Sequence, residues 1–247
     1  MTKSWDTHKG GYSFIGRKPT QQDEFYYSPS TINGDLVFVA DGVGGHAGGD
    51  YASHLCKEVF SKSFEQDPMI TDERAYLRDH IMEIARQVYH KGKTDDHFAN
   101  CGTTLSGFLL SGGRYHLFHV GDSRVYLFDQ EQSLIQLTED HSVVAQMLQR
   151  GEISEAEAKT HPQRNTMYSA IGQVPEEIRI DIVGPYDLNK GEILLAFSDG
   201  VHDALTDDEI RNIILKYPDI HDLCKEIVVA AYDAGGKDNI TAVGYRN

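Results

Sequence analysis

Residues 103–128 read TTLSGFLLSGGRYHLFHVGDSRVYLF and contain three apolar runs separated by short polar or glycine-containing breaks. The runs cover Thr103–Leu110, Tyr115–Val120 and Arg124–Phe128, and their length and aromatic or branched residues are typical of strands. Because these strands follow one another with no helix between them, they favour antiparallel sheet over a regular βαβ alternation.

The rest of the chain adds further strands and pairs of helices to this centre. Strand-like runs occur at Leu36–Ala40, Ile178–Val183, Ile193–Phe197 and Ile240–Tyr245. Helical segments are expected in pairs, 48–64 with 71–91 and 206–216 with 219–234. In the second segment Leu77, Ile81, Ile84 and Val88 form one apolar stripe. Clustered strands covered by paired helices predict an α+β layered domain.

Composition limits the function classes. The chain has 247 residues, of which 38 are acidic and 23 are Lys or Arg, for a formal net charge of −15. This length fits one large domain. Such an excess of acid argues against unaided nucleic-acid binding, which needs a basic stripe, and against docking on an anionic membrane.

Targeting signals and paired cysteines are missing from the sequence. No secretory signal is recognisable after Met1, and no run reaches the roughly 18 apolar residues of a transmembrane helix. The three cysteines, Cys56, Cys101 and Cys224, are far apart and form no CxxC motif. We therefore expect a reduced, cytoplasmic setting without disulfides.

Carboxylates recur at strand ends. Three apolar runs end in Asp41, Asp122 and Asp199, and Asp238 directly precedes the last strand. Each alone is typical of a turn, and Gly121-Asp122 could equally be a tight hairpin turn. Together they would repel one another unless a cation lay between them, and hard cations such as Mg²⁺ or Mn²⁺ accept all-oxygen ligands. The glycine at 42 would let a backbone carbonyl reach the same ion.

Other chemistries have weaker signals. The segment Gly42–Ala47 fits the loose G-x-G-x-x-A form of a dinucleotide fingerprint, but Asp41 would bring negative charge near a pyrophosphate. No G-x-S-x-G motif and no Walker A motif is present. His46 lies in the same glycine-rich turn, where spacing alone leaves a functional and a structural role equally open.

Taken in order, the motifs resemble the metal-dependent Ser/Thr protein phosphatases of the protein phosphatase 2C (PPM) family, in the compact bacterial form. The matching stretches are Gln21–Asp23, Val39–Gly49, Cys101–Leu105, His119–Arg124, Leu137–His141, Ala170–Gly172, Phe197–Gly200 and Lys237–Thr241. The resemblance extends from about Gly11 to Tyr245. It implies a central antiparallel β-sandwich flanked on both sides by helix pairs, a four-layer α-β-β-α domain over 1–247, with a small flap subdomain at about 142–172 that governs substrate choice.

The resemblance also implies a centre of two Mn²⁺ or Mg²⁺ ions with a weaker third. Asp41 would bridge both ions, the Gly42 carbonyl would bind one of them, and Asp199 and Asp238 would bind the other. Asp122, shared with Asp199, would hold the third ion.

The implied reaction is hydrolysis of phosphoserine and phosphothreonine by an activated water. Asp23 matches a carboxylate that holds metal-bound water, and His46 matches a histidine that protonates the leaving group. Gln22 and Asn239 would support the ligands from outside, Asn239 by orienting Asp238.

One position departs from the family. The usual phosphate-binding Arg falls at Lys18, with Arg17 one residue earlier. Two neighbours in a strand point to opposite sides, so either Lys18 binds the phosphate as a point charge or a local bulge brings Arg17 round to it. The bidentate geometry of its guanidinium favours Arg17.

The resemblance implies phosphorylated proteins as partners, together with a eukaryotic-like Ser/Thr kinase in the same cell, and a monomeric phosphatase. A pseudo-phosphatase that only binds partners is the alternative. The retained acidic residues argue against it.

Overall fold

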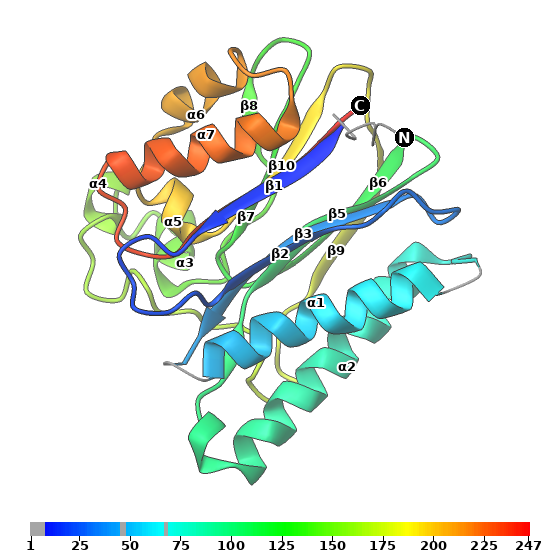
Figure 1. Ribbon diagram of the computed structural model, residues 1–247. Coiled ribbons are helices and arrows are strands. Elements are labelled where there is room, and N and C mark those ends of the chain that lie inside the picture. The colour runs from blue at the N-terminus through cyan, green and yellow to red at the C-terminus, as the bar shows by residue number, and fades with distance from the viewer. Residues whose placement is uncertain (1–7, 45–47, 67–68) are drawn as a thin grey trace.

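Two antiparallel sheets pack face to face in the computed structural model, which describes residues 8–44, 48–66 and 69–247 (Figure 1). The β1 sheet contains, in spatial order, β1 (Lys9–Phe14), β11 (Ile240–Arg246), β10 (Ile193–Phe197), β7 (Arg124–Phe128) and β8 (Leu134–Gln136). The β3 sheet contains β2 (Asp23–Tyr27), β3 (Asp35–Val43), β5 (Leu105–Ser111), β6 (Arg114–Val120) and β9 (Asp181–Asp187), with β4 (Gly102–Thr103) beside β3.

Helices cover the outer face of each sheet. The β3 sheet is covered by α1 (Gly48–Gln66) and α2 (Glu73–Thr94), and the β1 sheet by α6 (Asp207–Ile214) and α7 (Ile220–Asp233) (Figure 1). The shorter helices are η1 (Asp96–Phe98), α3 (Val143–Gln149), α4 (Glu155–Ala158) and α5 (Asp199–His202). The predicted four-layer α+β sandwich is confirmed. None of these helices is long and apolar enough to cross a membrane in the part of the chain that is described.

Strand β3 shows why the central strands are continuously apolar. Its side chains alternate between two buried faces, because Leu36 and Phe38 pack under α1 and α2 while Val37 and Val39 pack against the β1 sheet. A strand buried on both sides needs no polar face, so alternation of polar and apolar residues is absent.

The predicted helix boundaries also have visible physical causes. Helix α6 begins with a capping box, in which the side chains of Thr206 and Glu209 each accept a hydrogen bond from the other's backbone N–H. A second capping box opens α4 at Ser154. Helix α7 ends at Asp233, just before Gly235, which has φ +99°.

The two turns within 103–128 have different roles. Gly112 and Gly113, with φ of +59° and +78°, form the two-residue hairpin turn between β5 and β6. Gly121 and Asp122 do not form a hairpin, because β6 belongs to the β3 sheet and β7 to the β1 sheet. The hairpin interpretation of this pair is therefore wrong, and Asp122 lies where the chain crosses between sheets.

We expect Phe60→Ala to lower the free energy of unfolding by about 3–5 kcal/mol, because it leaves a cavity between α1 and the β3 sheet. The Phe60 ring is fully buried, 5.6 Å from the ring of Phe38 and 5.9 Å from that of Phe118. Urea denaturation followed by circular dichroism measures the loss. As a control, Ile32→Ala at a 79% exposed position should change stability by less than about 0.5 kcal/mol. If Phe60→Ala and Ile32→Ala lowered the free energy of unfolding equally, the contacts of Phe60 would not be part of the core.

Candidate metal and phosphate-binding site

The antiparallel strand order brings the candidate carboxylates to one edge of the sandwich. In an antiparallel pair the end of one strand lies beside the start of the next, and Asp23 at the start of β2 is paired directly with Asp41 near the end of β3. A cavity of about 370 Å³ opens at this edge, and its lining includes Lys18, Gln22, Asp41, Gly42, Asp122, Asp199 and Asp238. The structure therefore brings together all four carboxylates that the strand-end pattern indicated.

Burial and mutual repulsion make these carboxylates costly to ionise. Burial, followed by the charges of Asp23, Asp199 and their neighbours, raises the pKa of Asp41 well above its ordinary value. Burial and the charge of Asp122 do the same to the pKa of Asp199. A bound cation would reverse this cost, because it stabilises the ionised form of each carboxylate.

The donor set fits a hard divalent cation. The Oδ1 atoms of Asp199 and of Asp23 are buried and have no hydrogen-bond partner. Within the described ranges no three acidic, His or Cys side chains already form a group that could hold an ion. The carboxylates line one cavity without already forming such a group, so an ion there would need further oxygens from backbone carbonyls and water. All-oxygen ligands of this kind suit Mn²⁺ or Mg²⁺.

Asp122 lies at the sheet crossing, where a hydrogen bond from His202 holds its backbone. Burial, followed by the charge of Asp140, raises the pKa of the Asp122 carboxyl to about 7. Its backbone carbonyl accepts a hydrogen bond from Nε2 of His202, at 3.2 Å, at the end of the short helix that begins at Asp199. Burial lowers the pKa of His202 to about 3, so this ring is neutral.

Asp23 ties the two sheets together at this edge. Its Oδ2 accepts hydrogen bonds from the Ser198 hydroxyl at 2.8 Å and from the Thr241 hydroxyl at 2.6 Å. Burial outweighs these bonds and raises its pKa to about 6. The bonds orient the carboxylate so that the unpartnered Oδ1 is left available.

Two threonines fix the backbone of Asp41, and sequence reasoning assigned them no role. The Asp41 N–H donates to Oγ1 of Thr104 at 2.9 Å, and the Asp41 carbonyl accepts from Oγ1 of Thr103 at 2.9 Å. The Thr104 hydroxyl lies 2.7 Å from that of Ser123, the residue after Asp122. The only sequence signal was the Cys101–Leu105 motif, because a buried hydroxyl cannot be recognised without its partners.

Gly42 allows a close approach that no side chain would permit. A Cβ atom there would lie 2.4 Å from the Gly49 carbonyl oxygen and 2.7 Å from that of Gln22. The Gly42 N–H donates to this Gln22 oxygen at 3.1 Å. The backbone of residue 42 can therefore line the cavity beside Asp41.

Asn239 fastens the segment that carries the candidate phosphate-binding residues. Its side-chain Nδ2 donates to the carbonyls of Ile15 at 2.8 Å and Thr20 at 3.0 Å, and its Oδ1 accepts from the Gln22 N–H at 2.9 Å. Its own backbone N–H donates to Oδ1 of Asp238 at 2.8 Å. This geometry is compatible with the predicted supporting roles of Gln22 and Asn239, which stay predictions.

Arg17 and Lys18 lie in a turn beyond β1, which ends at Phe14, so the argument from strand alternation is wrong. The Arg17 guanidinium sits 5.1 Å from the Tyr232 ring centroid and donates to the Gly235 carbonyl at 3.2 Å. Lys18 lines the cavity, with Nζ 2.7 Å from Oδ2 of Asp238. Partial burial lowers the pKa of Lys18. The hydrogen bond to Asp238 and the charges of the nearby carboxylates together outweigh this effect, so the pKa is raised. The candidate proton donor, His46, lies outside the described residues.

Residues 10–232 match the family Protein phosphatase 2C. The chain belongs to the protein phosphatase 2C family. It is 34% identical over 215 residues to the serine/threonine phosphatase stp of Listeria welshimeri, covering 85% of this chain and 84% of that protein.

Solved structures of protein phosphatases agree with this assignment. The serine/threonine phosphatase of S. agalactiae superimposes with a TM-score of 0.89 at 29% identity, over 97% of this chain and 99% of that one. The catalytic domain of the phosphatase PstP, in complex with two manganese ions, gives a TM-score of 0.81 at 27% identity over 96% of each chain.

The dinucleotide interpretation is wrong for this member of the protein phosphatase 2C family. Strand β3 is antiparallel to both β2 and β5, whereas a dinucleotide fold needs parallel strands around the glycine turn.

Ionisation of the buried carboxylates should destabilise the metal-free phosphatase. Asp23 and Asp122 rise from an ordinary pKa of 3.8 to about 6 and about 7. The stability that their protonated forms contribute is complete below pH 3.8 and is lost as the pH rises through 6 and 7. With chelator at pH 7, Asp199→Asn should therefore raise the free energy of unfolding by about 1–3 kcal/mol, because it removes one buried charge.

Urea denaturation in chelator at pH 4.5 and pH 7 measures this difference. The stabilisation by Asp199→Asn should be smaller at pH 4.5, where more of the cluster is protonated. Asp79→Asn, an exposed carboxylate on α2, is the matched control and should change stability little at either pH. A destabilised Asp199→Asn variant at pH 7 would contradict the repulsion argument.

Proposed function

We propose that this chain hydrolyses phosphoserine and phosphothreonine on proteins, using two Mn²⁺ or Mg²⁺ ions and a weaker third ion at the carboxylate cavity. The observation that carries the proposal is the set of carboxylates, two of them with buried unpartnered oxygens, gathered at one edge of a protein phosphatase 2C sandwich. The similar phosphatase PstP was solved with two manganese ions, which supports the choice of metal.

We assign each proposed metal ligand to an ion according to its position around the cavity. Asp41 and the Gly42 carbonyl would hold one ion, and Asp41 would also contribute to the second. Asp199 and Asp238 would hold the second ion from the other sheet. Asp122, at the sheet crossing, would share the third ion with Asp199.

When bound, divalent cations lower the pKa of water and neutralise charge on the phosphoryl oxygens, which is most of the catalytic task in phosphoryl transfer. The protein's own contribution is orientation. Ser198 and Thr241 hold Oδ2 of Asp23, so its Oδ1 can accept a hydrogen bond from water opposite Asp41. Proton donation to the leaving oxygen by His46 stays a prediction.

We assign the phosphate to Lys18, whose side chain lines the cavity. Its ammonium is bound to Asp238, which is also a proposed metal ligand. If Asp238 held a divalent ion instead, the Lys18 ammonium would be free to bind a phosphoryl oxygen as a point charge. Arg17 is held away by Tyr232 and Gly235.

Lys18→Met should lower kcat/KM for a phosphothreonine peptide about tenfold or more, the usual effect of losing a charged hydrogen bond. Arg17→Met is the matched control, since it removes the same kind of charge one residue away, and it should change kcat/KM by less than about threefold. Steady-state kinetics at saturating Mn²⁺ measure both. The reverse order of effects would assign the phosphate to Arg17.

A pseudo-phosphatase that only binds partners is disfavoured by the cavity itself. All four strand-end carboxylates are retained and line one space. A chain without metal chemistry would gain stability by losing such buried charges, as argued above for Asp199.

Substrate choice and cellular partners follow from the family resemblance. We propose that the protein acts as a monomer on phosphoproteins made by a eukaryotic-like Ser/Thr kinase, and that the flap segment, residues 142–172, selects among them. The three cysteines are buried and free, in keeping with the predicted reduced cytoplasmic setting.

The purified protein should release phosphate from a phosphothreonine peptide and from p-nitrophenyl phosphate only when Mn²⁺ or Mg²⁺ is present. Chelator should abolish activity, and Asp199→Asn should lower it by at least about a hundredfold, because a ligand is lost. Asp79→Asn on the outer helix α2 should leave activity unchanged. Hydrolysis that survives both chelator and Asp199→Asn would refute the proposed function.

A further inference from the structure

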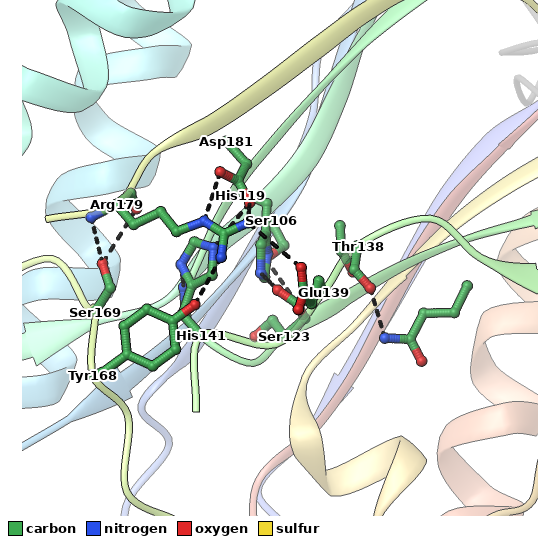
Figure 2. A network of polar contacts seen from close by, with 12 residues as sticks. Ser106, His119, Ser123, Thr138, Glu139, His141, Tyr168, Ser169, Arg179 and Asp181 are labelled. Atoms are coloured by element: carbon green, nitrogen blue, oxygen red, sulfur yellow. Dashed lines mark hydrogen bonds and ion pairs between the residues drawn. The ribbon is translucent and has the colours of Figure 1, made fainter. Parts of the chain in front are cut away.

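A second polar cluster, separate from the cavity carboxylates, holds the peptide that precedes Asp122 (Figure 2). His141 bonds both backbone groups of Gly121. Its N–H donates to the Gly121 carbonyl at 2.7 Å, and its ring Nδ1 accepts from the Gly121 N–H at 3.2 Å. The His141 side chain is fully buried. One residue therefore fixes the backbone at the point where the chain crosses between the sheets.

These bonds determine the state of the His141 ring. Because Nδ1 accepts a hydrogen bond, the ring hydrogen is on Nε2, which donates to Oδ2 of Asp181 at 3.1 Å. Asp181 on β9 is held in turn by Arg179, whose Nε lies 2.9 Å from Oδ1 and whose Nη2 lies 2.8 Å from Oδ2. This bidentate pair orients the carboxylate toward the imidazole.

Two of these residues, His141 and Arg179, also bind the base of the flap segment. The Tyr168 N–H donates to the His141 carbonyl at 2.9 Å, and Nη1 of Arg179 donates to the Tyr168 hydroxyl at 2.9 Å. The Ser169 hydroxyl bonds both the backbone N–H and the carbonyl of Arg179, at 2.8 and 3.2 Å. In Figure 2, Tyr168 and Ser169 lie on one side of this cluster, next to His141 and Arg179.

We infer that His141, Asp181 and Arg179 form a clasp of positioning residues that holds the Gly121–Asp122 turn and the base of the flap segment in one fixed relation. None of the three lines the carboxylate cavity. They act through the backbone that carries Asp122, and in its consequence for metal binding the inference rests on the proposed function. Breaking the clasp should loosen Asp122 and weaken cation binding there, and it should also free the flap base.

The position of the clasp makes it testable without unfolding the protein. A second cavity, of about 200 Å³, is lined in part by Glu139, Arg179 and Asp181. The Arg179 and Asp181 side chains are 43% and 30% exposed, so substituting them leaves no void in an apolar core. The buried His141 is a poorer target, because its loss would open a hole.

The decisive variant is Asp181→Asn. An asparagine amide at this position must turn its NH₂ toward the Arg179 fork or toward His141, and both already donate. The control is Asp35→Asn, which removes a carboxylate from an ion pair far from the clasp, between Asp35 at the far end of β3 from Asp41 and Lys9 on β1. Arg179→Lys, which keeps the charge but loses the fork, should have an intermediate effect and serves as the second variant.

Two measurements on the whole chain separate positioning from general stability. Isothermal titration with Mn²⁺ and no substrate should show the weakest binding step about tenfold weaker in Asp181→Asn, the usual effect of losing a ligand-orienting partner. Hydrogen exchange followed by NMR should show faster exchange of the Gly121 and Tyr168 amides. Asp35→Asn should change neither, even if it lowers the melting temperature.

Unchanged Mn²⁺ affinity and unchanged exchange at both amides in Asp181→Asn and Arg179→Lys would overturn the clasp. Faster exchange of Gly121 in Asp35→Asn as well would also overturn it, because the effect would then be general. Failure of the proposed function is distinguishable. A wild-type protein that binds no Mn²⁺ would refute the metal centre, and the amide exchange would still decide the clasp.

Discussion

Repulsion between carboxylates is the constraint on which the structure of the cavity edge of the sandwich depends. Asp23 and Asp41 are paired directly across β2 and β3, a like-charge arrangement that ordinarily destabilises a sheet. The repulsion at Asp41 is increased by the negative charges of Asp122, Asp199 and Asp238. The fold tolerates this because the apolar layers lie elsewhere, between the sheets and under the helices. Binding of a divalent cation would convert the repulsion into attraction, so the cost in stability and the capacity for catalysis share one cause.

Hydroxyl, amide and imidazole groups hold these carboxylates in place when no bound cation compensates their negative charge. Thr104 fixes the Asp41 backbone, Ser198 and Thr241 fix Asp23, and Asn239 fixes the chain beside Asp238. Neutral donors suit this purpose, because a permanent cation would compete with the metal. Lys18 is such a cation, since its ammonium lies 2.7 Å from Oδ2 of Asp238.

The sequence predicted most of the regular elements and missed those with weak patterns. Strand β3 and helix α2 were recognisable because their apolar residues follow the period of a buried strand and of an amphipathic helix. Strand β1 was missed since Gly10 and Gly11 contribute no apolar side chain. A Cβ atom on Gly10 would lie 2.8 Å from the backbone of His221, and one on Gly11 would lie 2.6 Å from the Phe25 ring, so packing requires the glycines there. Strand β2 was missed because only part of its short DEFYY segment is buried.

By itself, the sequence determined the class of the fold, the family resemblance and the carboxylates at strand ends, because periodicity, motif order and residue type are local properties of the chain. Tertiary structure alone decided that Gly121-Asp122 crosses between sheets instead of closing a hairpin, and that Lys18 rather than Arg17 reaches the cavity. It also decided that His141 joins the Gly121–Asp122 turn to Tyr168. Each of these depends on contacts between residues far apart in the chain, and the direction of a turn or side chain is set by those contacts, which local spacing does not encode.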